Sequence, residues 1–148
     1  MSFVAFGVVT ALYIVPRLRV RSRTDALLPL VVPHAFRFVG LSFLVPGVVS
    51  ASLPATFAVP AAYGDVVAAL LAVAASRALF KGAPWAVPLV WIFNVWGAAD
   101  LLNAFYQGAA AQLDPRMLGA AFYIPTVVVP PALILHGLIF WLLLRHRQ

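Results

Sequence analysis

The chain has 148 residues, of which 64% are hydrophobic and 9% are charged, and its mean hydropathy is +1.02. A typical soluble domain is about half apolar and about a quarter charged, so this composition excludes that class. The net charge is +6, but the basic residues stand in short runs between apolar stretches. Because a nucleic-acid site needs basic residues gathered on one solvated face, the charge does not predict nucleic-acid binding. Lipid is the expected solvent and the first expected partner.

Five apolar segments are predicted to form membrane helices. The last four are long enough for the ~20 residues that a crossing needs. The first segment is short and spans only if the side chains of Arg17 and Arg19 extend to the membrane interface. The prediction is therefore five transmembrane helices, or four if the first segment does not span. All residues, 1–148, are assigned to one all-α transmembrane helical-bundle domain. The segments are Ser2–Pro16, Ala26–Ala51, Pro60–Leu79, Trp85–Tyr106 and Leu118–Leu144.

The basic residues predict the orientation of these segments. If the chain crosses five times, eight of the ten basic residues fall on one side, and only Arg116, beside Asp114, lies on the other. Loops rich in Lys and Arg stay in the cytoplasm, which predicts an external N-terminus, a cytoplasmic C-terminus and a multi-pass protein of a bacterial inner membrane. The eight residues are Arg17, Arg19, Arg21, Arg23, Arg77, Lys81, Arg145 and Arg147.

Polar residues inside the segments are the candidates for function, because each is costly in hydrocarbon and usually faces the bundle interior. At about 1.5 Å of rise per residue, His34, Arg37, Asn94 and His136 share one layer in the inner part of the membrane. Asp100 lies about 6 Å further out, within reach of the Arg37 side chain. An Arg37–Asp100 ion pair that fastens the second segment to the fourth is therefore one interpretation.

The other polar residues have structural interpretations. Asp65 follows Gly64 near the predicted start of the third segment, where a carboxylate caps free N–H groups of a helix. His34 follows Pro33 near the start of its helix, where interfacial water can satisfy the imidazole. His136 has no polar neighbour on its own helix, so we expect it to find a partner in Asn94 or Arg37.

Three functional hypotheses use the same residues. In the first, Arg37, Asn94, His136 and Asp100 line a pocket among the second, fourth and fifth segments. The protein would then be a binding or accessory subunit that either holds a lipophilic ligand, such as a quinone or a lipid, in that pocket or packs against partner membrane subunits.

In the second hypothesis, His34 and His136 are the axial ligands of a haem b, with Arg37 beside a propionate. The third is a small oligomeric transporter in which Asp65, Asp100, Arg37 and His136 relay protons or bind a polar solute. Catalysis is the weakest hypothesis, since the chain has no cysteine and no nucleophile–base pair or metal-ligand motif can be named.

Several short strings occur together in a familiar order. They are HAFRFVG at 34–40, LPATFAVP at 53–60, GD at 64–65, NVWGAAD at 94–100 and IPTVVVP at 124–130, followed by His136. Together they resemble a family of small bacterial integral membrane proteins with no assigned activity. The resemblance covers residues 32–144 and leaves the first segment outside. It implies a membrane bundle with a polar set at Arg37, Asp65, Asn94, Asp100 and His136, in which His136 is more firmly fixed than His34.

Overall fold

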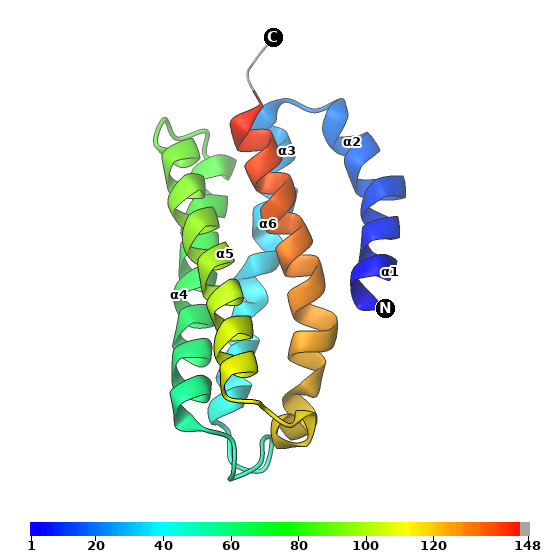
Figure 1. Ribbon diagram of the computed structural model, residues 1–148. Coiled ribbons are helices and arrows are strands. Elements are labelled where there is room, and N and C mark those ends of the chain that lie inside the picture. The colour runs from blue at the N-terminus through cyan, green and yellow to red at the C-terminus, as the bar shows by residue number, and fades with distance from the viewer. Residues whose placement is uncertain (146–148) are drawn as a thin grey trace.

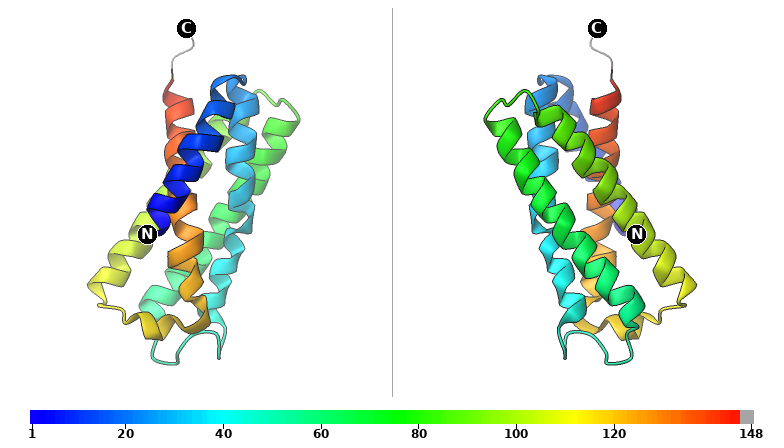
Figure 2. Two further views of the ribbon diagram at one scale, coloured as in Figure 1. Left: turned by 90° about the vertical axis from the view of Figure 1, so that its right-hand side faces the viewer. Right: turned by 90° about the vertical axis from the view of Figure 1, so that its left-hand side faces the viewer.

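The computed structural model describes residues 1–145, and every regular element in that range is a helix. Together they form five stretches long and apolar enough to cross a membrane. Four of these stretches lie side by side as a bundle, and the first lies outside it against α6 (Figures 1 and 2). The elements are α1 (Ser2–Val9), η1 (Thr10–Ile14), α2 (Val15–Arg19), α3 (Arg23–Val31), η2 (Val32–Leu44), α4 (Ala55–Phe80), α5 (Ala86–Ala110), η3 (Pro115–Phe122), η4 (Ile124–Val128) and α6 (Val129–Leu144).

The second stretch changes helix type at its centre. It begins as the α-helix α3, which contains Pro29, and continues from Val32 as η2, a 3-10 helix of 13 residues. Such helices rarely exceed four residues, and their side chains at positions i and i+3 lie in one line. The buried residues of η2 follow that period: His34, Arg37, Gly40 and Phe43. The 3-10 geometry therefore places His34 and Arg37 on the same inward face.

Prolines also change the helix type elsewhere. The π-helical turn η1 ends two residues before Pro16, and η4 contains Pro125 and ends two residues before Pro130. A proline has no N–H, and its ring collides with the carbonyl four residues earlier, so the preceding turn widens.

Some predicted boundaries are wrong. The third stretch starts at Ala55, and Pro60 lies inside α4 rather than at its start. The fifth does not begin as one continuous helix at Leu118, because Gly119 interrupts η3 with φ 50°. The fourth continues to Ala110, so the loop that follows is shorter than predicted.

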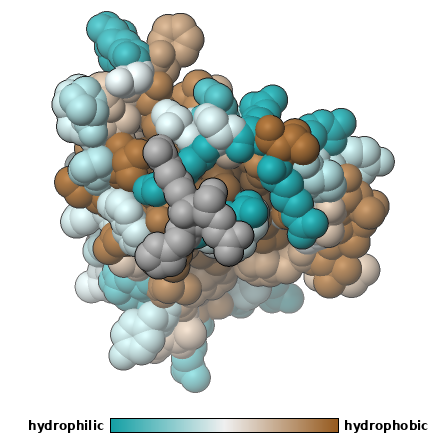
Figure 3. All heavy atoms as spheres, turned by 90° about the horizontal axis from the view of Figure 1, so that it is seen from above, coloured by the Kyte–Doolittle hydropathy of each residue, from teal (hydrophilic) through white to brown (hydrophobic). Residues whose placement is uncertain are grey.

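Three basic regions lie at the same end of the bundle, which we call the basic end. They are the α2–α3 connection, the α4–α5 connection and the end of α6 (Figure 1). Seen from above, hydrophilic side chains gather over this end (Figure 3). Arg116 lies in η3 at the opposite end. Arg147, which also contributes to the predicted orientation, lies outside the described residues.

The core consists of two apolar clusters with polar residues between them. One cluster, around Leu27, Phe93 and Ile139, lies toward the basic end, and the other, around Phe57 and Leu118, lies toward the opposite end. Helix α4 packs against η2 and α5, and nine of its twelve buried residues are alanine or glycine. Small residues allow helix backbones to approach closely, so polar side chains between the clusters are brought within hydrogen-bond distance.

Candidate functional site

Arg37 is the centre of the buried polar cluster, and its side chain is 3% exposed. Its Nε donates to Oδ1 of Asp65 at 2.7 Å, and Nη2 donates to Oδ2 of Asp100 at 2.5 Å. Nη1 donates to the carbonyl of Gly97 at 3.0 Å. One side chain on η2 thus binds both α4 and α5. The Arg37–Asp100 ion pair predicted from the sequence is present.

Asp65 has a different role from the one predicted. It lies about three turns inside α4, far from the N-terminal N–H groups that a capping carboxylate would bind. Its carboxylate forms the second ion pair of Arg37 instead. The capping prediction failed because it placed the start of the helix at Pro60, five residues too late.

His136 and Asn94 form a reciprocal pair beside the guanidinium. Nδ1 of His136 is 2.7 Å from Oδ1 of Asn94, and Nδ2 of Asn94 donates to the carbonyl of His136 at 3.3 Å. Nε2 of His136 lies 3.5 Å from Nη1 of Arg37. Because a guanidinium only donates, Nε2 must accept and Nδ1 must carry the hydrogen. Both partners expected for His136 are therefore in place, and they select a neutral tautomer.

Three glycines make room for this cluster. An ideal Cβ at Gly97 would lie 2.6 Å from Cε1 of His136 and 2.9 Å from Nη1 of Arg37. A Cβ at Gly64 would collide with the Asp100 carboxylate, and one at Gly40 with Asp65. All three glycines belong to the strings that carry the family resemblance, and this steric requirement is a physical reason for their presence.

His34 is buried, contrary to the prediction that interfacial water satisfies it. It is 1% exposed, because its helix begins at Arg23 and because it lies on the inward face of η2. Its ring centroid is 4.2 Å from that of His136 and 5.1 Å from that of Phe93. Neither ring nitrogen of His34 has a hydrogen-bond partner among residues 1–145.

The two histidines do not fit the axial positions of a haem as they are placed. Axial imidazoles lie on opposite faces of the macrocycle, whereas these rings are in direct contact. In addition, Nε2 of His136 faces the Arg37 guanidinium. Within the described part of the chain, no group of three or more His, Asp or Glu side chains could hold a metal ion.

A cavity of about 130 Å³ adjoins the cluster on the side away from the basic end. Its walls are apolar except for Asp65 and Asp100. The second oxygen of each carboxylate, Oδ2 of Asp65 and Oδ1 of Asp100, accepts no hydrogen bond from residues 1–145. The remaining wall is formed by Phe43, Phe57, Ala61, Leu101, Ala104, Phe105, Leu113, Leu118, Ile124, Pro125 and Val129.

The charges of the cluster do not balance. Two carboxylates face one guanidinium, and the imidazole of His136 is neutral. An uncompensated charge is expensive in a low-dielectric interior. The carboxylates can therefore accommodate one additional proton or cation.

Comparison with known proteins gives one match. A family model described as a domain of unknown function (DUF8737) matches residues 1–144. No curated protein and no solved structure shows a significant match to the chain. The match agrees with the resemblance to a family without an assigned activity. It also includes residues 1–31, which the resemblance leaves outside.

Proposed function

We propose that this chain, which belongs to the DUF8737 family, is a membrane protein that binds a small lipophilic cation, such as a protonated amine, in the cavity beside Asp65 and Asp100. The observation that carries the proposal is the excess carboxylate at the wall of an otherwise apolar cavity. The apolar wall would hold the body of the ligand, and the carboxylates of Asp65 and Asp100 would accept hydrogen bonds from its charged group.

A cation fits the free hydrogen-bonding capacity of the site better than a quinone does. A quinone carbonyl needs a donor. The donor groups of Arg37, His136 and Asn94 donate within the cluster, and none of these three residues lines the cavity. While both carboxylates are ionised, Asp65 and Asp100 offer only acceptors to a ligand in the cavity. Arg37, Asn94 and His136 therefore hold the two carboxylates in position, and the carboxylates contact the ligand.

The volume of the cavity indicates the size of the ligand group that fits inside it. A buried apolar cavity of about 150 Å³ holds one benzene molecule, and the cavity here is of similar volume, about 130 Å³. Phe43 and Phe57 stand at its wall with their ring centroids 5.6 Å apart. Aromatic faces attract cations, so an aromatic or compact aliphatic ammonium ion is the expected class.

The proposed setting is a bacterial inner membrane, crossed by all five helical stretches, with the basic end in the cytoplasm. This orientation is supported by three basic regions that share one end of the bundle and by the preference of Lys- and Arg-rich loops for the cytoplasm. In that orientation the cavity lies toward the external side. We assign the chain a binding role, as a ligand-holding or accessory subunit that assembles with itself or with other membrane subunits.

Binding of benzylammonium tests the proposal, with benzyl alcohol as a neutral analogue of nearly the same shape. We expect isothermal titration of the detergent-purified protein at pH 7 to give at least tenfold tighter binding of the ammonium ion. Asp100→Asn should bring the two affinities to within about a factor of two, and Asp65→Asn should act in the same direction.

The matched control is Asp114→Asn, which removes a carboxylate outside the cavity and should keep the tenfold preference. Tryptophan fluorescence establishes that each variant remains folded. Equal affinity for the two compounds in the wild-type protein would overturn the proposal, and so would an unchanged preference in folded Asp100→Asn.

A further inference from the structure

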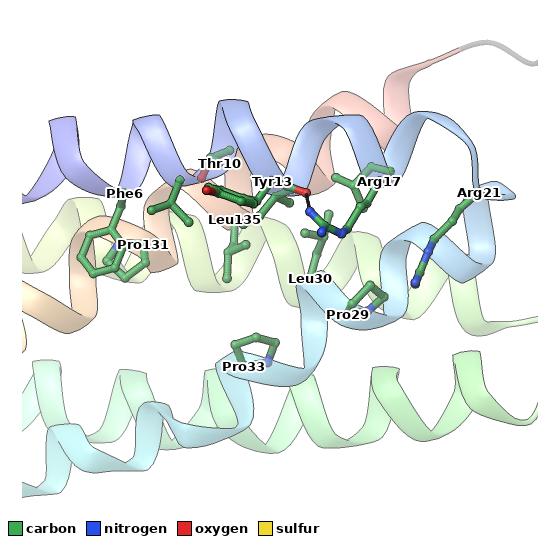
Figure 4. Close-up of a pocket in the computed structure, with 13 residues that line it drawn as sticks. Phe6, Thr10, Tyr13, Arg17, Arg21, Pro29, Leu30, Pro33, Pro131 and Leu135 are labelled. Atoms are coloured by element: carbon green, nitrogen blue, oxygen red, sulfur yellow. Dashed lines mark hydrogen bonds between the residues drawn. The ribbon is translucent and has the colours of Figure 1, made fainter.

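A second hollow lies on a different face of the bundle, between the first helical stretch and the pair α3 and α6 (Figure 4). This groove has a volume of about 400 Å³. Its sides are apolar, with Phe6 and Val9 from α1 facing Leu30 of α3 and Leu135 of α6. Arg17 and Arg21 line one end of the groove. It shares no lining residue with the cavity beside Asp65 and Asp100.

The groove exists because the first stretch packs loosely on the bundle. Of its residues Ser2–Arg19, only Leu18 is buried. Pro29, Pro33 and Pro131 face the groove from the bundle side (Figure 4). Their rings and the change from α3 to η2 prevent regular ridge-into-groove packing with a straight helix. The hollow is therefore built into the backbone and does not result from a single small side chain.

The two arginines at its end are available to an anion. Nη1 of Arg17 donates to the carbonyl of Tyr13 at 2.7 Å, and its guanidinium carbon lies 5.9 Å from the centre of the Tyr13 ring. These contacts hold Arg17 along the groove. Within residues 1–145, neither Arg17 nor Arg21 forms an ion pair with a carboxylate. Guanidinium groups bind phosphate in a bidentate manner, and basic pockets between membrane helices recognise anionic head groups.

The length of the groove corresponds to one leaflet of a bilayer. Phe6 and Arg17 are eleven residues apart along one continuous helical stretch, which is about 16 Å at ~1.5 Å per residue. The hydrocarbon core of a bilayer is ~30 Å thick, so one leaflet contributes about half of that. An acyl chain anchored at Arg17 would therefore reach Phe6 near the middle of the membrane. The charged end lies at the basic end of the bundle, where head groups of that leaflet would lie.

We propose that this groove binds one anionic phospholipid, with an acyl chain along Val9, Leu30 and Leu135 and the head-group phosphate between Arg17 and Arg21. The bound chain fills the space that the prolines leave and holds the first stretch against α3 and α6. This site requires only that the helices lie in a bilayer, and it does not depend on the cation proposed for the other cavity.

Native mass spectrometry of the full chain in detergent tests the proposal with phosphatidylglycerol and with phosphatidylcholine of the same acyl chains. We expect one phosphatidylglycerol to bind at least fivefold more tightly than phosphatidylcholine. Arg17→Gln combined with Arg21→Gln should remove that preference. The matched control is Arg19→Gln combined with Arg77→Gln, which removes the same charge from exposed positions outside the groove. This control should keep the preference for phosphatidylglycerol.

Two further measurements separate the groove from simple charge attraction. Leu135→Trp fills the apolar part without changing any charge and should weaken phosphatidylglycerol binding at least fivefold. Glycerol phosphate, which has no acyl chain, should not displace the lipid. Equal binding of the two lipids, unchanged binding in the Arg17 and Arg21 double variant, displacement by glycerol phosphate, or a dimer that excludes the lipid would each overturn the proposal.

Discussion

Replacing Arg37 by glutamine should destabilise the bundle far more than neutralising either of its carboxylate partners. Arg37→Gln leaves Asp65 and Asp100 facing each other in the interior, where their side chains are only 10% and 12% exposed. Removing one partner from a buried ion pair costs about 3–5 kcal/mol. Asp100→Asn has a smaller effect, because Asp65 still compensates the guanidinium and the new amide oxygen still accepts a hydrogen bond. The difference between a charged and a neutral acceptor is about 1 kcal/mol.

Unfolding in mixed micelles, followed by the fluorescence of the four tryptophans, measures these differences. The triple variant, Arg37→Gln with Asp65→Asn and Asp100→Asn, contains no buried charge in the cluster and should recover at least half of the loss in Arg37→Gln. If Arg37 and Asp100 formed an isolated pair, Asp100→Asn would cost as much as Arg37→Gln. That result, or a loss below about 1 kcal/mol in Arg37→Gln, would refute the reasoning.

Three other predictions follow from the geometry. Gly97→Ala should lower the free energy of unfolding by several kcal/mol, since its Cβ would meet the His136 ring. The control Gly137→Ala, whose Cβ meets nothing within 4 Å, should remain near wild type in the same unfolding assay. Equal effects of the two substitutions would contradict the close packing at Gly97. Asn94→Leu leaves the Nδ1 hydrogen of His136 without its acceptor and should cost about 1–3 kcal/mol in that assay; a neutral result would show that the pair is dispensable. A phosphatase reporter, active only outside the cytoplasm, should be active in the loop 111–114 and inactive at the C-terminus; the reverse pattern would invert the proposed orientation.

The helices that are long and apolar enough to cross a membrane, and the main polar residues within them, follow from the sequence alone. An apolar content of 64% with 9% charge leaves too few polar side chains to cover a water-facing surface. The positions of five long apolar stretches and of the basic runs between them follow directly from the printed chain. Depth along each stretch was also sufficient to predict that Arg37 can reach Asp100 and that His136 finds a partner in Asn94 or Arg37, and both contacts are present.

Only the tertiary structure showed that Asp65 is not a helix cap and that His34 is buried rather than at the interface. Pro60 suggested a helix start, yet α4 begins at Ala55, and this shift moves Asp65 from a cap to the middle of a helix. Apolar composition does not distinguish an α-helix from a 3-10 helix, and the two differ by about 0.5 Å of rise per residue. Over the 13 residues of η2 that difference amounts to about 6 Å, and the period changes from 3.6 to 3.0 residues per turn. Depth and facing direction in this stretch therefore depend on its helix type. The local prolines alone do not specify that type, because the close packing of η2 against the small residues of α4 also contributes.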